Sequence, residues 1–115
     1  MTLQEFYQQV GGDYEETLGR IPSAQMLPRF ILKFCGDKTF DNLCRAVEAE
    51  QWDETFRAVH TLKGVAQNLG FERLYRAAFE LNEAVRGPQA LTDAVLLEHV
   101  KQEYAMVMDA IGKLE

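Results

Sequence analysis

The stretch HTLKGVAQNLG, from His60 to Gly70, brings together three residue types that could handle a phosphoryl group. The imidazole of His60 can be uncharged near neutral pH, and one of its ring nitrogens is then a nucleophile. The ammonium of Lys63 offers three donors on a flexible stem, which suits a phosphate. Gly64 has no Cβ, so another molecule can approach the helix closely there. A histidine that accepts a phosphoryl group needs this combination of access, nearby positive charge and clearance.

The spacing of these residues predicts that they share one face of a helix. At 3.6 residues per turn, the apolar residues of the segment form a stripe that faces a core: Phe56, Val59, Leu62, Ala66 and Leu69. A second stripe, rotated toward solvent, contains Arg57, His60, Lys63, Gly64 and Gln67. We therefore expect His60 to be exposed or half-exposed in the middle of the helix.

Gly64 is unusual within a helix, where glycine is about 1 kcal/mol less favourable than alanine. Close approach of a ligand or of another backbone would offset this loss. Taken singly, each residue also has an ordinary interpretation. His60 could be a surface histidine, Lys63 a solvated lysine, and Gly64 a point of helix packing. Only their combination in one register indicates a site.

The stretch also resembles a known family signature. HTLKGVAQNLG is similar to the pattern H-x-L-K-G-x-[AS]-x-x-[LI]-G of histidine-containing phosphotransfer (HPt) domains. The segments FDNLCRAVEAEQWDETFRAVHTLKG and LGFERLYRAAFELNEAVRG resemble the family as well, and the likeness covers about residues 25–114. One departure is Val65, where many relatives have a small residue. We expect it to tighten packing and to leave the chemistry unchanged.

The resemblance implies a function. In this family an exposed histidine takes a phosphoryl group from the aspartate of a receiver domain and passes it to another receiver. The domain is a phosphocarrier without kinase activity of its own, and the sequence contains no nucleotide-binding glycine-rich loop. The implied partners are response-regulator receiver domains, a hybrid histidine kinase, or both. No cofactor of its own is implied, because the receiver supplies Mg²⁺.

The resemblance also assigns roles to residues at matching positions. His60 is the phosphorylated residue, Lys63 stabilises the phosphate, and Gly64 provides steric access. Some relatives place a polar and a basic residue near the imidazole on the following helix, and Asn82 and Arg86 occupy such positions here. We treat Arg57, Gln67, Asn82 and Arg86 as candidates for contact with a partner or for support of the imidazole.

The elements around the site are predicted to be helices, since apolar residues recur at spacings of three and four. We expect helices at 2–10, from Asp13 to Gly19, from Ser23 to Phe34, from Thr39 to Glu50, from a cap at Asp53 to Leu69, from Glu72 to Arg86, and from Thr92 or Asp93 nearly to the end. Pro28 should kink or break the third helix. Gly70 suits a left-handed helix end.

The predicted architecture is all-α. Short connections favour antiparallel neighbours, so the last four helices should form an up-down four-helix bundle, with the first three covering one of its ends. We expect one HPt-like domain over 1–115, with N-terminal helices at about 1–34 and the bundle at about 37–114. Cys35 and Cys44 have no metal-ligand spacing, and we interpret both as buried thiols on helices.

Composition excludes several other function classes. The net charge of −6 argues against a nucleic-acid binder. No apolar run reaches the roughly 18 residues of a membrane span, and no signal peptide is visible, so we expect a cytoplasmic protein. We also expect a monomer, although the sequence does not exclude weak dimerisation. His60 and His99 alone do not make a metal site, and no hydrolytic set of residues can be named. Two alternatives stay open: a non-catalytic helical docking module, and a piece of a hybrid kinase.

Overall fold

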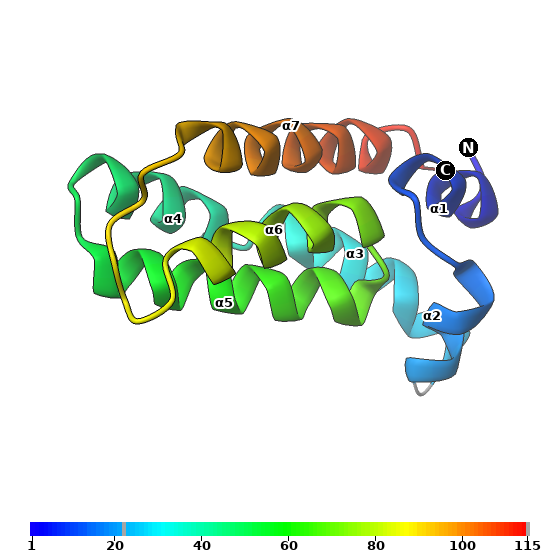
Figure 1. The fold of residues 1–115 in the computed structure, drawn as a ribbon. Coiled ribbons are helices and arrows are strands. Elements are labelled where there is room, and N and C mark those ends of the chain that lie inside the picture. The colour runs from blue at the N-terminus through cyan, green and yellow to red at the C-terminus, as the bar shows by residue number, and fades with distance from the viewer. Residues whose placement is uncertain (22, 115) are drawn as a thin grey trace.

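The computed structural model describes residues 1–21 and 23–114, and in that part of the chain all regular structure is helical. Figure 1 shows how the helices are arranged. Their bounds are α1 Leu3–Val10, α2 Tyr14–Arg20, a 3₁₀ helix Ala24–Met26, α3 Leu27–Cys35, α4 Thr39–Glu48, α5 Trp52–Leu69, α6 Glu72–Ala84 and α7 Ala94–Ile111. The predicted all-α class is confirmed.

Several predicted helix boundaries are confirmed by their caps. The Asp13 and Asp93 carboxylates accept hydrogen bonds from the backbone at the start of α2 and α7. Pro28 lies in the first turn of α3, so the break falls just before it, where the 3₁₀ helix gives way to α3. Gly70 ends α5 with φ at 75°, in the left-handed region.

The predicted cap of α5 is wrong. The helix begins at Trp52, after Gln51, and no side chain caps it. Glu50 adopts a φ of 55° in the loop that follows α4, and α5 begins two residues before the predicted start. Asp53 therefore lies within the first turn, where its carboxylate faces the positive end of the helix dipole.

The bundle is formed by α4, α5, α6 and α7, but α4 is too short to cover α5. It has 10 residues against 18 in α5, which is about 15 Å against 27 Å of helix. The remaining length is covered by α3, which contacts both α5 and α7 and continues the line of α4 in Figure 1. The Tyr104 ring lies at this joint, 5.7 Å from the Phe34 ring and 3.8 Å from the Phe40 ring. The prediction that all three N-terminal segments cover one end is thus wrong for α3.

An end of the bundle is covered by α1. Its Tyr7 hydroxyl donates a 2.7 Å hydrogen bond to the carbonyl of Leu69, at the turn between α5 and α6. Phe6 packs edge-on against Phe71 in the same place, with ring centroids 5.8 Å apart. The chain after α1 approaches this turn so closely that a Cβ on Gly12 would overlap the carbonyl oxygen of Gly70.

One apolar core includes side chains from α1, α3, α4, α5, α6 and α7. The prediction of two buried thiols is only partly right. Cys44 is half-buried, and burial raises the pKa of its thiol, whereas Cys35 is the last residue of α3 and is exposed. None of the described helices is both long and apolar enough to cross a membrane.

Candidate functional site

The two faces of α5 are sharply different. Its buried residues lie on the side toward the core: Thr55, Val59, Leu62, Ala66 and Leu69. Phe56, expected in this stripe, is only half-buried, and Thr55 is buried instead, its hydroxyl donating to the Gln51 carbonyl at 2.9 Å. At 100° per residue, Gly64 lies almost opposite the centre of the buried stripe. His60 and Gln67, both exposed, lie on either side of Gly64 along the helix.

Gly64 is not a point of helix packing. A Cβ built on it would have no atom within 4 Å, apart from its chain neighbours and its own helix backbone. The missing side chain therefore leaves open space one turn beyond His60. An incoming molecule could come close to the helix there.

His60 is exposed and makes no hydrogen bond or ion pair with any described residue. The nearest aromatic ring is that of Phe56, one turn earlier, with the two centroids 6.1 Å apart and the rings nearly parallel at 18°. The imidazole is thus supported on one side while its nitrogens stay available.

Lys63 directs its ammonium toward α6. Its Nζ lies 5.6 Å from the centroid of the Phe79 ring, a cation–π contact, and it has no ion pair within the described chain. Phe79 itself is 42% exposed. A cation held only by a ring at the surface can move to a neighbouring anion at small cost.

The Lys63–Phe79 contact also fixes the level of residues across the α5–α6 hairpin. The two helices are antiparallel, so a step back along α5 corresponds to an equal step forward along α6. Three residues before Lys63 is His60, and three residues after Phe79 is Asn82, so these two lie at the same level. Asn82 is 1% exposed, and its Nδ2 has no hydrogen-bond partner in the described structure. Asn82 therefore lies beneath the surface at this level of the hairpin.

Arg86 does not reach the level of His60. The predicted helix to Arg86 ends at Ala84, because the chain tightens into turns before Gly87 and Pro88. Arg86 is exposed and forms an ion pair with Glu83. Counting along the antiparallel pair places it near Phe56, one turn away from the imidazole.

The remaining candidates lie on the exposed face. Arg57 pairs with Glu54 at 3.1 Å, and both side chains are more than half exposed. The backbone carbonyl of Gln67 accepts a 2.6 Å hydrogen bond from Arg20 of α2. Sequence reasoning missed Arg20, since nothing in the spacing of α2 shows that it reaches α5.

His99 lies in a different setting. It is exposed on α7, which packs against α6, α1 and α3. Gln102 and Glu103 follow it by three and four residues, so no cation and no glycine shares its face in the next turn. No three His, Cys, Asp or Glu side chains of the described residues are grouped so as to hold a metal ion.

Comparison with known families agrees with this arrangement. Residues 36–110, more than half of the chain, match the family model described as the Hpt domain. The chain belongs to the Hpt domain family. The predicted resemblance is confirmed, and the helical fold is compatible with the Hpt helical bundle. No curated protein and no solved structure matches the chain significantly.

Membership of the Hpt family implies histidine phosphotransfer in phosphorelay signalling, with receiver or kinase proteins as partners. Hpt domains are phosphocarriers rather than kinases. The matched region contains both histidines of this chain, so the family alone does not say which of them carries the phosphoryl group. The matched region begins after α3, so it excludes α1, α2, the 3₁₀ helix and α3.

Proposed function

We propose that His60 is the phosphoryl acceptor of a phosphorelay, taking the group from a receiver-domain aspartate and passing it to a second receiver. The observation that carries this assignment is the open space at Gly64, one turn from an exposed imidazole whose nitrogens have no described partner. His99 has neither feature. We further propose that residues 1–115 act together as one monomeric, cytoplasmic domain, because α1 and α3 contribute to the same core as the bundle.

The proposed reaction is a direct exchange between two proteins. An unprotonated ring nitrogen of His60 attacks the phosphorus of the receiver's aspartyl phosphate. The new P–N bond forms as the P–O bond to the carboxylate breaks, and the carboxylate electrons stay on the receiver. The second transfer is the reverse exchange with another aspartate. Such transfers depend mainly on positioning and on charge stabilisation, so a small site on a helix is sufficient.

The neighbouring residues have distinct proposed roles. Lys63 leaves the Phe79 ring and binds the phosphoryl oxygens, while Gly64 leaves room for the loops of the receiver around the acceptor aspartate. Asn82 supports the imidazole from beneath, and Arg57 and Gln67 contact the docked partner. No metal is assigned to this chain, because Mg²⁺ is expected to arrive with the receiver.

The first prediction tests the acceptor. His60→Gln should abolish labelling by a panel of phosphorylated receiver domains from the same organism, with helicity unchanged. Wild-type label should be lost in acid and kept in base, because a phosphoramidate is acid-labile whereas an acyl phosphate is base-labile. His99→Gln is the matched control and should label normally. Full labelling of His60→Gln would show that the acceptor lies elsewhere.

The alternative of a docking module without phosphorylation has one observation in its favour, the exposed Phe79 ring beside the site. In that case wild-type protein would bind a receiver yet take up no label, and His60→Gln would bind with the same affinity. The same labelling experiment therefore separates the two functions.

A further inference from the structure

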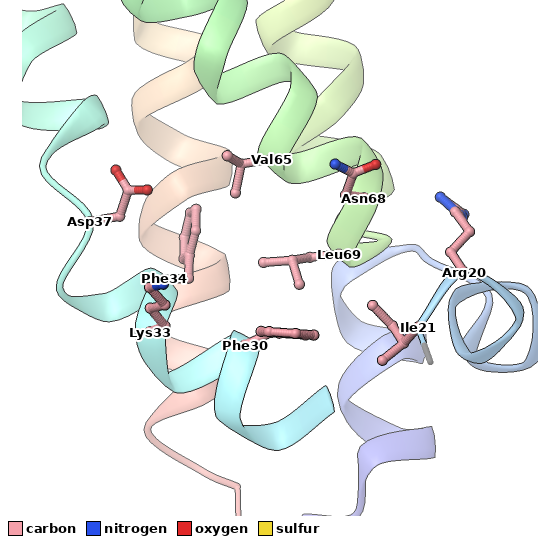
Figure 2. Close-up of a pocket in the computed structure, with 9 residues that line it drawn as sticks. All are labelled: Arg20, Ile21, Phe30, Lys33, Phe34, Asp37, Val65, Asn68 and Leu69. Carbon is pink, nitrogen blue, oxygen red and sulfur yellow. The ribbon is translucent and has the colours of Figure 1, made fainter. Parts of the chain in front are cut away.

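His60 lies on α5 between two hollows of the surface. Toward the end of the helix, a cleft of about 470 Å³ separates α5 from α3 (Figure 2). Toward its start, a groove of about 520 Å³ lies between α4 and α5, and Arg57 lines it from the α5 side. Arg57 is therefore on the α4 side of the histidine, whereas the ammonium of Lys63 points toward Phe79 of α6.

The imidazole lies over the turn of α5 that contains Arg57. Side chains on a helix point back toward its N-terminus, and the His60 ring lies 6.1 Å from that of Phe56 and nearly parallel to it. Arg57 and Lys63 are three residues before and three after His60, so each is about 4.5 Å from it along the axis, on opposite sides of it around the helix. A phosphoryl group on the imidazole would thus have one cation on each side.

The ion pair that holds Arg57 can exchange easily. Its Nη1 lies 3.1 Å from Oε1 of Glu54, and the two side chains are 71% and 54% exposed. Ion pairs as exposed as this contribute little to stability, because solvent screens them. Arg57 makes no other ion pair with any residue that the structure describes.

A phosphoryl group is a stronger ligand for a guanidinium than one carboxylate is. It carries more negative charge and offers three acceptor oxygens. Arginine binds such oxygens through two parallel hydrogen bonds. Glu54 is exposed, so water can solvate its carboxylate once the guanidinium has left. The balance of these contacts favours exchange of the carboxylate for the phosphoryl group.

We propose that Arg57 is a second phosphate-binding residue of this chain, which leaves Glu54 and binds the phosphoryl oxygens once His60 is phosphorylated. The contact forms within the free protein, so it stabilises the phosphorylated histidine between the two transfers. It is separate from any contact that Arg57 makes with a docked receiver. This inference rests on the proposed phosphotransfer function.

The test measures the pKa of the phosphoryl group itself. Protein carrying His99→Gln, which leaves His60 as its one histidine, is labelled with phosphoramidate, a small donor that needs no docking, and titrated by ³¹P NMR. A cation in contact with the oxygens favours the doubly charged form, so Arg57→Gln should raise this pKa by about 0.5. Glu54→Gln should lower it, because Arg57 then has no competing partner. Arg76→Gln is the matched control, since Arg76 is 72% exposed and pairs with a glutamate of α6, and it should leave the pKa unchanged.

The double variant distinguishes a change of partner from a general effect of charge. If Glu54→Gln acts by freeing Arg57, its effect on the phosphoryl pKa should fall by more than half in the Arg57→Gln background. Two charges that act independently would give additive effects.

The equilibrium with a receiver gives a second readout. The overall constant for transfer compares free proteins, so contacts that exist only in the docked complex cancel from it and affect the rates alone. We expect Arg57→Gln to shift this constant about threefold toward the phosphorylated receiver, the size of an exposed charged contact.

An unchanged phosphoryl pKa in Arg57→Gln would overturn the proposal, and so would additive effects of the two substitutions. A larger rise in Arg45→Gln would also overturn it, because the contact would then belong to Arg45 on the α4 wall of the groove. Failure of the phosphotransfer function is distinct: no receiver would then label the wild type, while the chemically labelled protein could still be titrated.

Discussion

At the scale of single residues, Gly64 is the position where stability and function are in conflict. Its side-chain space is open, so Gly64→Ala should raise the free energy of unfolding by about 1 kcal/mol through helix propensity alone. Gly64→Gln should keep the melting temperature near that of the wild type and slow transfer from a receiver strongly. Thermal melts beside transfer time courses measure both effects.

Lys63→Ala is the control for the glycine series, because it weakens phosphate stabilisation without obstructing access. It should slow transfer, and it should also slow labelling by phosphoramidate, which Gly64→Gln should affect much less. A large drop in the melting temperature of Gly64→Gln with normal transfer by the folded protein would instead place the glycine against another helix.

The face of the helix on which His60 and Gly64 lie was predictable from the sequence, whereas the exchange of Phe56 for Thr55 in the buried stripe was not. The helical period alone places His60 and Gly64 opposite the apolar stripe, and the structure agrees. The environments of Asn82 and Arg86 were not predictable in this way. They depend on the register of the α5–α6 hairpin and on where α6 ends, and both are set by contacts between helices.

At the scale of elements, the hydrogen bond from Tyr7 to the Leu69 carbonyl attaches α1 to the end of the histidine helix. Tyr7→Phe should lower the free energy of unfolding by about 1 kcal/mol at neutral pH, because it leaves a buried carbonyl without its donor. Chemical denaturation of the two proteins measures the difference.

The same tyrosine gives a dependence on pH. Burial raises the pKa of Tyr7, while the unfolded chain loses this proton near pH 10. The contribution of the protonated, buried phenol is therefore complete below about pH 10 and declines above it. Between pH 9 and 11 the stability of Tyr7→Phe should fall less steeply than that of the wild type. Equal slopes would mean that burial of this phenol does not control alkaline unfolding.

Helix boundaries were predictable wherever a local signal sets them, as at Asp13, Pro28, Gly70 and Asp93. The start of α5 was not, because no side chain caps it and the loop before it contains Glu50 at a positive φ, a conformation that glutamate does not signal in the sequence. The place of α3 beside α5 was not predictable either, since it follows from the shortness of α4 and from the aromatic joint at Tyr104.

At the scale of the whole molecule, Arg73 connects three helices. It forms a 3.0 Å ion pair from α6 to Glu103 of α7, whose side chain is only 5% exposed, and its aliphatic stem lies over Gly11 at the end of α1. Arg73→Ala should lower the free energy of unfolding by about 1–3 kcal/mol, because it leaves a buried carboxylate without its partner.

A double-mutant cycle separates the pair from its surroundings. The double variant Arg73→Met with Glu103→Leu should lose less free energy of unfolding than the two single variants lose when their losses are added. Urea denaturation of the four proteins measures these losses. Transfer by the folded variants should match the wild type, since neither residue lies near His60. Strict additivity would show that the two charges do not interact.

The cleft between α3 and α5 could not be predicted from local sequence patterns. Its walls come from residues 20–37 and 65–69, segments that are distant in sequence and meet only in the folded chain. Their residue types are unremarkable in isolation. The sequence therefore contains no local signal for this cleft.

The docking of α1 also has a consequence for synthesis on the ribosome. The partner of Tyr7 lies 62 residues further along the chain, so α1 cannot bury its apolar face until the α5–α6 turn has emerged. α5 and α6 are separated by only two residues and can pair as soon as both exist. The histidine helix and its partner are thus free to assemble early. Phe6, Tyr7 and Val10 stay without their final neighbours in the meantime, and the nascent chain carries that exposed apolar face until the turn is made.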